Sequence, residues 1–246
     1  MVDIHCHILP QVDDGAGSWE MAVEMCAIAR SDGIKHIVAT PHANDHYSYD
    51  REFLQATVDR LREQVGTNGL AFSLGCDFHM SYDNLQNVFV NPQHYVIGST
   101  RYLLVEFSNF GIPPQMTTCL QRLLDGGIMP VITHPERYPG LKNSLHRVLE
   151  WVAQGCVVQV TASSLTGGWG EHAEASARWL MDRDAVHVLA TDAHNTTRRM
   201  PVLSKARDEV ASTYGDDVAQ ALVDGNPRAI VSGQALPYFP DPMMKR

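Results

Sequence analysis

The chain has 246 residues, of which 44% are hydrophobic and 19% are charged, and its formal net charge is −9. The apolar content is ample for a core, and the negative charge argues against a general binder of nucleic acids or anionic membranes, because both functions need a basic face. Apolar runs are far shorter than the roughly 20 residues of a membrane-spanning helix, so we expect no membrane insertion.

Strand-like apolar runs alternate with helical patterns along the chain. The runs begin near residues 2, 35, 71, 102, 129, 156 and 186, and spacings of roughly 27–36 residues are typical of βα units. Helices are predicted at 18–32, 50–66, 114–126, 143–154, 171–183, 201–214, 216–224 and 225–233. The strands are continuous and β-branched, as expected where both faces of a parallel sheet are covered.

This alternation has no linker-like stretch, so it predicts a single α/β domain over residues 1–246, closed into a barrel. A doubly wound open sheet is the alternative, although no Gly-rich dinucleotide fingerprint follows the first strand. In a parallel barrel, functional side chains collect at the C-terminal ends of the strands.

Side chains of the types that bind metals stand at those ends. The strands contribute His5 and His7, then His42, Asp77, Glu106 and His134, and finally Asp192 and His194. Two residues separated by one other residue, such as His5 and His7, lie on the same face of a strand, about 6–7 Å apart. Only the run at 156–164 has no such residue. We therefore predict a metal centre with nitrogen and oxygen ligands, which suits manganese, iron or zinc and not a thiolate-selecting metal.

Three further residues near this set have open roles. Asp13 and Asp14 lie in an Asp-Asp-Gly sequence that is common in turns, but a loop carboxylate after His7 could complete a third metal site, and we favour Asp14 for it. His79 shares a strand face with Asp77 and is a further candidate ligand.

The cysteines indicate the compartment. There are five, an odd number, and no C-x-x-C pair occurs, so free thiols in a reducing environment are expected. No signal peptide precedes the first strand. We predict a cytoplasmic protein.

Seven motifs together resemble a known superfamily. They are DIHCHILPQVDDG (3–15), TPH (40–42), GCDFH (75–79), EF (106–107), HPERY (134–138), TDAHN (191–195) and NPRAI (226–230). This set resembles the polymerase and histidinol phosphatase (PHP) superfamily, and within it the metal-dependent protein tyrosine phosphatases encoded in bacterial capsule and exopolysaccharide operons. The resemblance implies a distorted TIM-like (β/α)7 barrel of PHP type.

The resemblance also implies three divalent metal ions, with manganese favoured and iron, zinc or magnesium as alternatives. His5, His7, Asp77 and Asp192 would hold one ion; Asp77 would bridge to a second, completed by Glu106 and His134; Asp14, His42 and His194 would hold the third. The family usually has glutamate where this chain has Asp77, so the carboxylate is one methylene shorter and His79 could assist it.

The implied reaction is hydrolysis of phosphotyrosine on a protein, namely the tail of a tyrosine kinase of polysaccharide export, by metal-activated hydroxide. No C-x5-R loop of a cysteine-dependent phosphatase is present. Arg137 and Arg199 match phosphate geometry and are predicted to be catalytic, together with Asp192 as a proton donor. Loop aromatics that could flank the substrate ring are Tyr47, Tyr49, Phe110, Tyr138 and Trp169.

Other functions remain open. An amidohydrolase also begins with His-x-His, but it would place histidine on the strand near 156–164, which lacks one here. A PHP enzyme acting on a small phosphate ester such as histidinol phosphate would share the scaffold. A metal-stabilised module that binds a phosphopeptide without hydrolysing it is the non-enzyme alternative. The oligomeric state is open as well.

Overall fold

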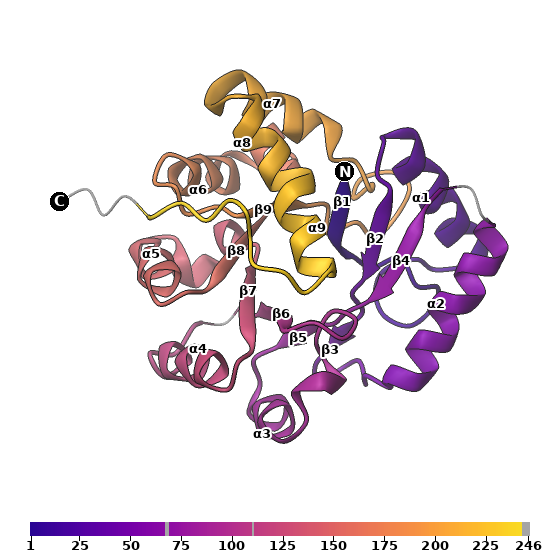
Figure 1. The fold of residues 1–246 in the computed structure, drawn as a ribbon, viewed down its shortest axis with the longest axis horizontal. Helices are drawn as coiled ribbons and strands as arrows, with labels where there is room; N and C mark the ends of the chain where they lie inside the picture. The colour runs from indigo at the N-terminus through magenta and orange to yellow at the C-terminus, as the bar shows by residue number, and fades with distance from the viewer. Residues whose placement is uncertain (67–68, 110, 243–246) are drawn as a thin grey trace.

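The computed structural model describes residues 1–66, 69–109 and 111–242, and in it parallel strands run through the middle of the molecule with helices arranged around them (Figure 1). The strands are β1 (Val2–Cys6), β2 (His36–Ala39), β3 (His42–Ala43), β4 (Ala71–Leu74), β5 (Asp77–His79), β6 (Tyr102–Glu106), β7 (Met129–Thr133), β8 (Val157–Thr161) and β9 (Val188–Ala190). The helices are α1 (Trp19–Ser31), α2 (Arg51–Val65), α3 (Tyr82–Val90), α4 (Gln115–Asp125), α5 (His146–Ala153), α6 (Glu171–Met181), α7 (Ser204–Tyr214), α8 (Asp216–Gln220) and α9 (Asn226–Val231).

The strands form two parallel sheets with the orders β1-β2-β4 and β3-β5-β6-β7-β8-β9. Backbone hydrogen bonds also link the first strand to the segment after the last one: Asp192 N–H donates to the His5 carbonyl at 2.8 Å, and His7 N–H donates to the Ala193 carbonyl at 2.9 Å. The pair His5 and His7, from the first strand, therefore lies next to the pair Asp192 and His194, which follows the last strand.

Two of the predicted strands are interrupted, and the break moves their ends into the second sheet. β2 stops before Pro41, which has no N–H to donate to a ladder, and β3 then begins at His42. β4 stops before Gly75, where a Cβ atom would lie 3.0 Å from the Val38 and Ile97 side chains. Beyond these breaks β3 pairs with β5, and His42 is in register with Asp77.

The core explains why the polar side chains stay at one end of the strands. One apolar cluster consists mostly of strand residues, among them Ile4, Leu104, Val131, Val157 and Val188, and each of these five is 0% exposed. They precede the polar strand ends in the sequence. A larger cluster packs the helices against the strands.

Most predicted elements are present, with shifts of a few residues at their ends. If β2 with β3 and β4 with β5 are each counted as one position, the described residues provide seven strand positions. Helix α3 was not predicted, although Ser81 caps it by accepting from Asn84 N–H. In the described part of the chain, no helix combines the length and apolarity needed to cross a membrane.

Candidate metal centre

The nine side chains predicted to bind metal lie together at the C-terminal ends of the strands. Among the described residues they form four overlapping groups, within each of which the ligand atoms are at most 4.8 Å from one another. The groups are His7, Asp14, His42 and His194; His5, Asp77 and His134; His5, His7 and Asp192; and His42, Asp77 and Glu106. Because the groups share members, they make one continuous cluster.

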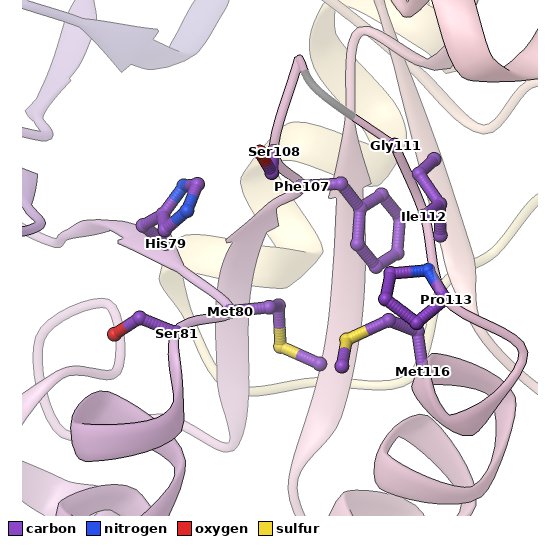
Figure 2. A pocket seen from close by; sticks show the side chains of 9 residues that line it. All are labelled: His79, Met80, Ser81, Phe107, Ser108, Gly111, Ile112, Pro113 and Met116. Carbon is purple, nitrogen blue, oxygen red and sulfur yellow. The ribbon is translucent and has the colours of Figure 1, made fainter.

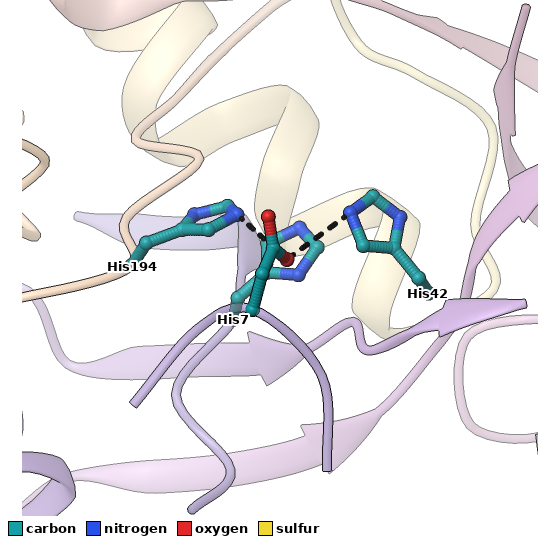
Figure 3. A group of neighbouring side chains, drawn as sticks. His7, His42 and His194 are labelled. Atoms are coloured by element: carbon teal, nitrogen blue, oxygen red, sulfur yellow. Dashed lines mark ion pairs between the residues drawn. The ribbon is translucent and has the colours of Figure 1, made fainter. Parts of the chain in front are cut away.

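Asp14 lies between two histidines on the open side of this cluster. Its Oδ1 is 3.5 Å from His42 Nε2 and 3.4 Å from His194 Nε2. In Figure 3 the rings of His42 and His194 lie on either side of His7, and dashed lines mark the two ion pairs of Asp14. The Asp14 side chain is 49% exposed, so this part of the cluster is accessible from solvent.

Asp77 lies at the buried centre. Its Oδ2 is 3.3 Å from His42 Nδ1 and 3.4 Å from His5 Nε2. Both Asp77 carboxylate oxygens are buried without a hydrogen-bond donor, and His134 Nδ1 also has no partner. A buried carboxylate without donors is costly, and a divalent cation would neutralise it. The donor set therefore fits metal ions.

Two residues outside the predicted set orient the first pair of histidines. His5 Nδ1 lies 2.9 Å from Gln159 Oε1 on β8, and His7 Nδ1 lies 2.7 Å from Asp13 Oδ2. The two Nε2 atoms are thereby directed into the cluster, 3.3 Å apart. Metal-binding histidines commonly have their second nitrogen fixed in this way. The sequence contains a signal for Gln159, namely a single amide in an otherwise apolar strand.

Asp192 joins the cluster to the two predicted arginines. Its Oδ1 is 3.4 Å from His5 Nε2, while its Oδ2 pairs with Arg137 Nη1 and, at 2.6 Å, with Arg199 Nη2. The Trp169 ring lies against both guanidinium groups, with its centroid 3.6 Å from Arg137 Cζ and 5.1 Å from Arg199 Cζ. The structure thus brings the three predicted catalytic residues together.

Burial and charge set the protonation of the metal-free cluster. Burial disfavours charged His5, but the Asp77 and Asp192 carboxylates raise its pKa to about 9. His42 is likewise buried, yet its contact with Asp14 and the nearby carboxylates raise its pKa to about 10. Burial and the neighbouring His194 lower the pKa of His7 to about 4. Since a ligating imidazole must be neutral, metal ions would displace protons from His5 and His42.

The backbone is unusual at two cluster residues. His134 and Asp192 have φ angles of +33° and +50°, a region that non-glycine residues rarely adopt. Each follows the end of a strand, β7 or β9. Such conformations cost free energy and are found preferentially at functional sites.

His79 lies at the edge of the cluster rather than inside one of the four groups. Its Nδ1 is 3.7 Å from Glu106 Oε2. Together with Met80, Phe107 and Met116 it lines a cavity of about 570 Å³ (Figure 2). Whether His79 assists Asp77 stays a prediction, but the cavity adjoins the cluster at Glu106.

The predicted loop aromatics have different surroundings. The Tyr47 ring is stacked near the His42 ring, with a centroid distance of 6.0 Å and an interplanar angle of 13°. Tyr49 donates its hydroxyl to the Gly75 carbonyl, and Tyr138 accepts from Phe107 N–H, so both are packed into the structure. Phe110 lies outside the described residues. Among the predicted aromatics that the structure describes, Tyr47 and Trp169 thus lie beside the cluster, and so does the buried Tyr138, whose ring centroid is 5.2 Å from that of His134.

Sequence comparisons place this architecture among known proteins. The model of a family described as capsular polysaccharide synthesis, CpsB/CapC, matches residues 1–232. The tyrosine-protein phosphatase CpsB of Streptococcus pneumoniae is 33% identical over 247 residues, which cover 96% of this chain and 100% of the relative. The tyrosine-protein phosphatase YwqE of Bacillus subtilis is 28% identical, covering 100% of this chain and 97% of the relative.

Solved structures show the same relationship to tyrosine phosphatases of this kind. One described as that of YwqE from Bacillus subtilis and CpsB from Streptococcus pneumoniae, metal-dependent tyrosine phosphatases, has a TM-score of 0.92 at 29% identity and covers 100% of both chains. A lactonase from Listeria monocytogenes has a TM-score of 0.59 at 12% identity and covers 95% of both chains, which shows a shared fold alone. The predicted fold class is confirmed.

Proposed function

Since this chain belongs to the CpsB/CapC family of capsular polysaccharide synthesis, we propose that it is a metal-dependent phosphatase that hydrolyses phosphotyrosine on proteins. The observation that carries the proposal is the cluster of nine nitrogen and oxygen donors with two arginines at its border. Relatives along nearly the full length are named tyrosine-protein phosphatases, and a structural relative is described as metal-dependent.

We propose three divalent ions in this cluster, with manganese first and iron, zinc or magnesium as alternatives. The overlap of the groups supports more than one ion, because Asp77 and His42 each belong to two of them. The donors are imidazole and carboxylate, which suit these metals. Bound cations would supply Lewis-acid charge for phosphoryl oxygens and make water nucleophilic at neutral pH.

Arg137 and Arg199 are proposed to bind the phosphoryl group. Asp192 Oδ2 holds one Nη atom of each, which leaves their other N–H groups for phosphoryl oxygens; Arg199 Nε is buried without a partner. A guanidinium fork matches the geometry of phosphate and keeps its charge at working pH.

Asp192 is proposed as a ligand and as the anchor of the arginines. Burial opposes its ionisation, but His5, Arg137 and Arg199 hold its pKa well below the usual range. It is therefore ionised at neutral pH and has no proton to give, which disfavours the proton-donor role predicted from the sequence. A phenolate, with a pKa near 10, leaves without a strong acid.

We further propose that the substrate is a tyrosine kinase of polysaccharide export and that the protein acts in the cytoplasm. The family description supports the first of these. The free thiols of all five cysteines support the second, because a reducing compartment preserves them.

The test measures phosphate release from p-nitrophenyl phosphate, a phosphotyrosine peptide, its phosphoserine counterpart and histidinol phosphate. We expect hydrolysis of the two aryl phosphates, loss of at least about 100-fold after chelation, and recovery with Mn²⁺. Undiminished turnover in chelator would refute the metal-dependent mechanism. Preference for histidinol phosphate would instead favour the small-molecule alternative, and tight peptide binding without phosphate release would favour the binding module.

A further inference from the structure

A second cavity, of about 160 Å³, is lined in part by Arg198, the neighbour of Arg199 in the sequence. It has no part in the proposed phosphatase chemistry. It is formed by the 3-10 helix Ala162–Thr166, the loop before α7 and the first turn of α7. Its polar lining is Ser163, Thr166, Arg198 and Lys205. Two hydroxyl groups and two cationic groups therefore face one small space.

The two cationic side chains, Arg198 and Lys205, have no anionic partner among the described residues. Both are exposed, and neither takes part in an ion pair in the part of the chain that the structure describes. Arg207, also on α7, pairs instead with Asp208 and Asp216. The cavity thus offers uncompensated positive charge.

The loop before α7 is fixed so that consecutive arginines serve different sites. The Asn195 side-chain oxygen accepts from the backbone N–H groups of Arg198 and Arg199, at 2.9 and 3.1 Å. Arg199 reaches Asp192 in the metal centre, whereas Arg198 lines the second cavity. Trp169 connects the two places, because it contacts Ser163 of the cavity lining and also the Arg199 guanidinium.

The Trp169 side chain lies between the second cavity and the arginines of the metal centre. Trp169 Nε1–H donates to Ser163 Oγ at 3.0 Å, so the Ser163 hydroxyl keeps its own proton for an acceptor in the cavity. The same indole lies against Arg137 and Arg199. Gly168 permits this approach, because a Cβ atom there would lie 2.9 Å from Ser163 Cβ.

We propose that this cavity binds an anionic side chain of the polypeptide substrate close in sequence to the phosphotyrosine. The group is a carboxylate or the phosphoryl group of a second modified residue, since both accept from hydroxyl and cationic donors. The inference rests on the proposed function, because it assigns sequence preference to the same phosphatase. p-Nitrophenyl phosphate has no anionic group besides its phosphoryl group, so the cavity affects peptide substrates only.

The experiment uses phosphotyrosine peptides of one parent sequence in four series, which carry glutamate, glutamine, a second phosphotyrosine or tyrosine, each placed in turn one to four residues from the phosphotyrosine. They are compared with p-nitrophenyl phosphate in the Mn²⁺-loaded protein. The variants are Arg198→Gln, Lys205→Gln and the double variant, with Arg207→Gln as the control that removes the same charge from α7. Arg198→Lys tests whether charge alone restores the preference.

We expect the wild-type protein to favour at least one anionic peptide over its neutral counterpart by about three- to tenfold in kcat/KM, mainly through KM. The double variant loses this preference, Arg207→Gln keeps it, and turnover of p-nitrophenyl phosphate is unchanged in all of them. The preference also shrinks at high salt. Glutamate or phosphotyrosine as the favoured group identifies the carboxylate or the phosphoryl source.

Equal kcat/KM for anionic and neutral peptides, or a preference that survives in the double variant, overturns the inference. Failure of the proposed function has a different signature, which is no hydrolysis of p-nitrophenyl phosphate or any phosphotyrosine peptide by the Mn²⁺-loaded protein. In that case the affinities of the same peptides for the wild-type and double-variant proteins, measured by calorimetry, test whether the cavity binds the anionic side chain.

Discussion

Gln159 shows how a residue outside the proposed ligand set can orient a proposed ligand. Its Oε1 lies 2.9 Å from His5 Nδ1, so it accepts a hydrogen bond from that nitrogen and leaves His5 Nε2 directed into the cluster. The side chain is 0% exposed, which fixes the imidazole orientation. The sequence predicted the ligands from their strand-end positions, but Gln159 and Asp13 depend on how neighbouring strands and loops align, and that alignment is not written in local spacing.

Replacing Gln159 with leucine should weaken metal binding by about 10- to 100-fold, because loss of a partner that fixes a ligating histidine has effects of that size. The measurement is a competition titration of Mn²⁺ against a chelating dye. Gln154→Leu, at an exposed position after α5, is the control and should bind as the wild type does. Unchanged Mn²⁺ affinity in Gln159→Leu would show that His5 is oriented without it. An unfolding curve in chelator checks that each variant folds.

The segment from Ala162 to Gly170 illustrates what is decided at the scale of an element. Trp169 could not be distinguished from the other loop aromatics in the sequence, because its contacts depend on a tight turn. Gly168 N–H donates to the Ser163 carbonyl at 2.8 Å, and the indole then lies over the Arg137 guanidinium. Glu136, the residue before Arg137, accepts from Thr161 N–H and the Ser164 hydroxyl. The turn that carries Arg137 is thereby tied to this segment.

Trp169→Leu should lower kcat/KM for p-nitrophenyl phosphate about tenfold, since an aromatic face on a desolvated guanidinium is worth up to about 2 kcal/mol. Metal content should stay the same, and Trp169→Phe should restore most of the activity. Trp179→Leu removes a similar contact, with Arg183 Cζ 3.9 Å from the ring, far from the cluster in sequence and on α6. If Trp169→Leu loses metal, or matches the Trp179 variant in activity, the arginines are positioned by other contacts.

For the whole molecule, the alternation of strands and helices could be predicted from the sequence. The division of the strands between two sheets could not. The βα spacing predicted the strand positions, since each unit is a local pattern. The interruption at Gly75 depends on packing between β2, β4 and the Ile97 side chain, which local patterns do not contain. Pro41, which has no N–H to donate, is by contrast a local signal for the break after β2. The extent of a single domain over residues 1–246 stays a prediction, as does the oligomeric state.

Stability as a whole should depend on pH through His187, which directly precedes β9 and belongs to none of the four ligand groups. Burial lowers its pKa to about 3, from an ordinary 6.5. Between these values the unfolded chain binds a proton that the folded protein does not, so stability is full above about pH 6.5 and falls as the pH drops toward 3. Relative to pH 7.5, this single group should reduce the free energy of unfolding by about 2 kcal/mol at pH 5.

Urea unfolding in chelator at pH 7.5 and pH 5 measures this effect without any contribution from metal loss. His187→Gln should lose less stability than the wild type between the two pH values, by about the same 2 kcal/mol. The exposed His172 provides the control, because His172→Gln should track the wild type. Parallel pH profiles for wild type and His187→Gln would mean that His187 does not titrate differently on unfolding.

The hydrogen bonds between the end of β1 and the residues after β9 carry a consequence for biosynthesis. His5 leaves the ribosome early, but Asp192 and His194 emerge only after most of the polypeptide has been translated. A nascent chain therefore cannot assemble its reactive cluster until these two residues have emerged, and a product cut short before Asp192 would lack hydrolytic power while still carrying most of the strands described here.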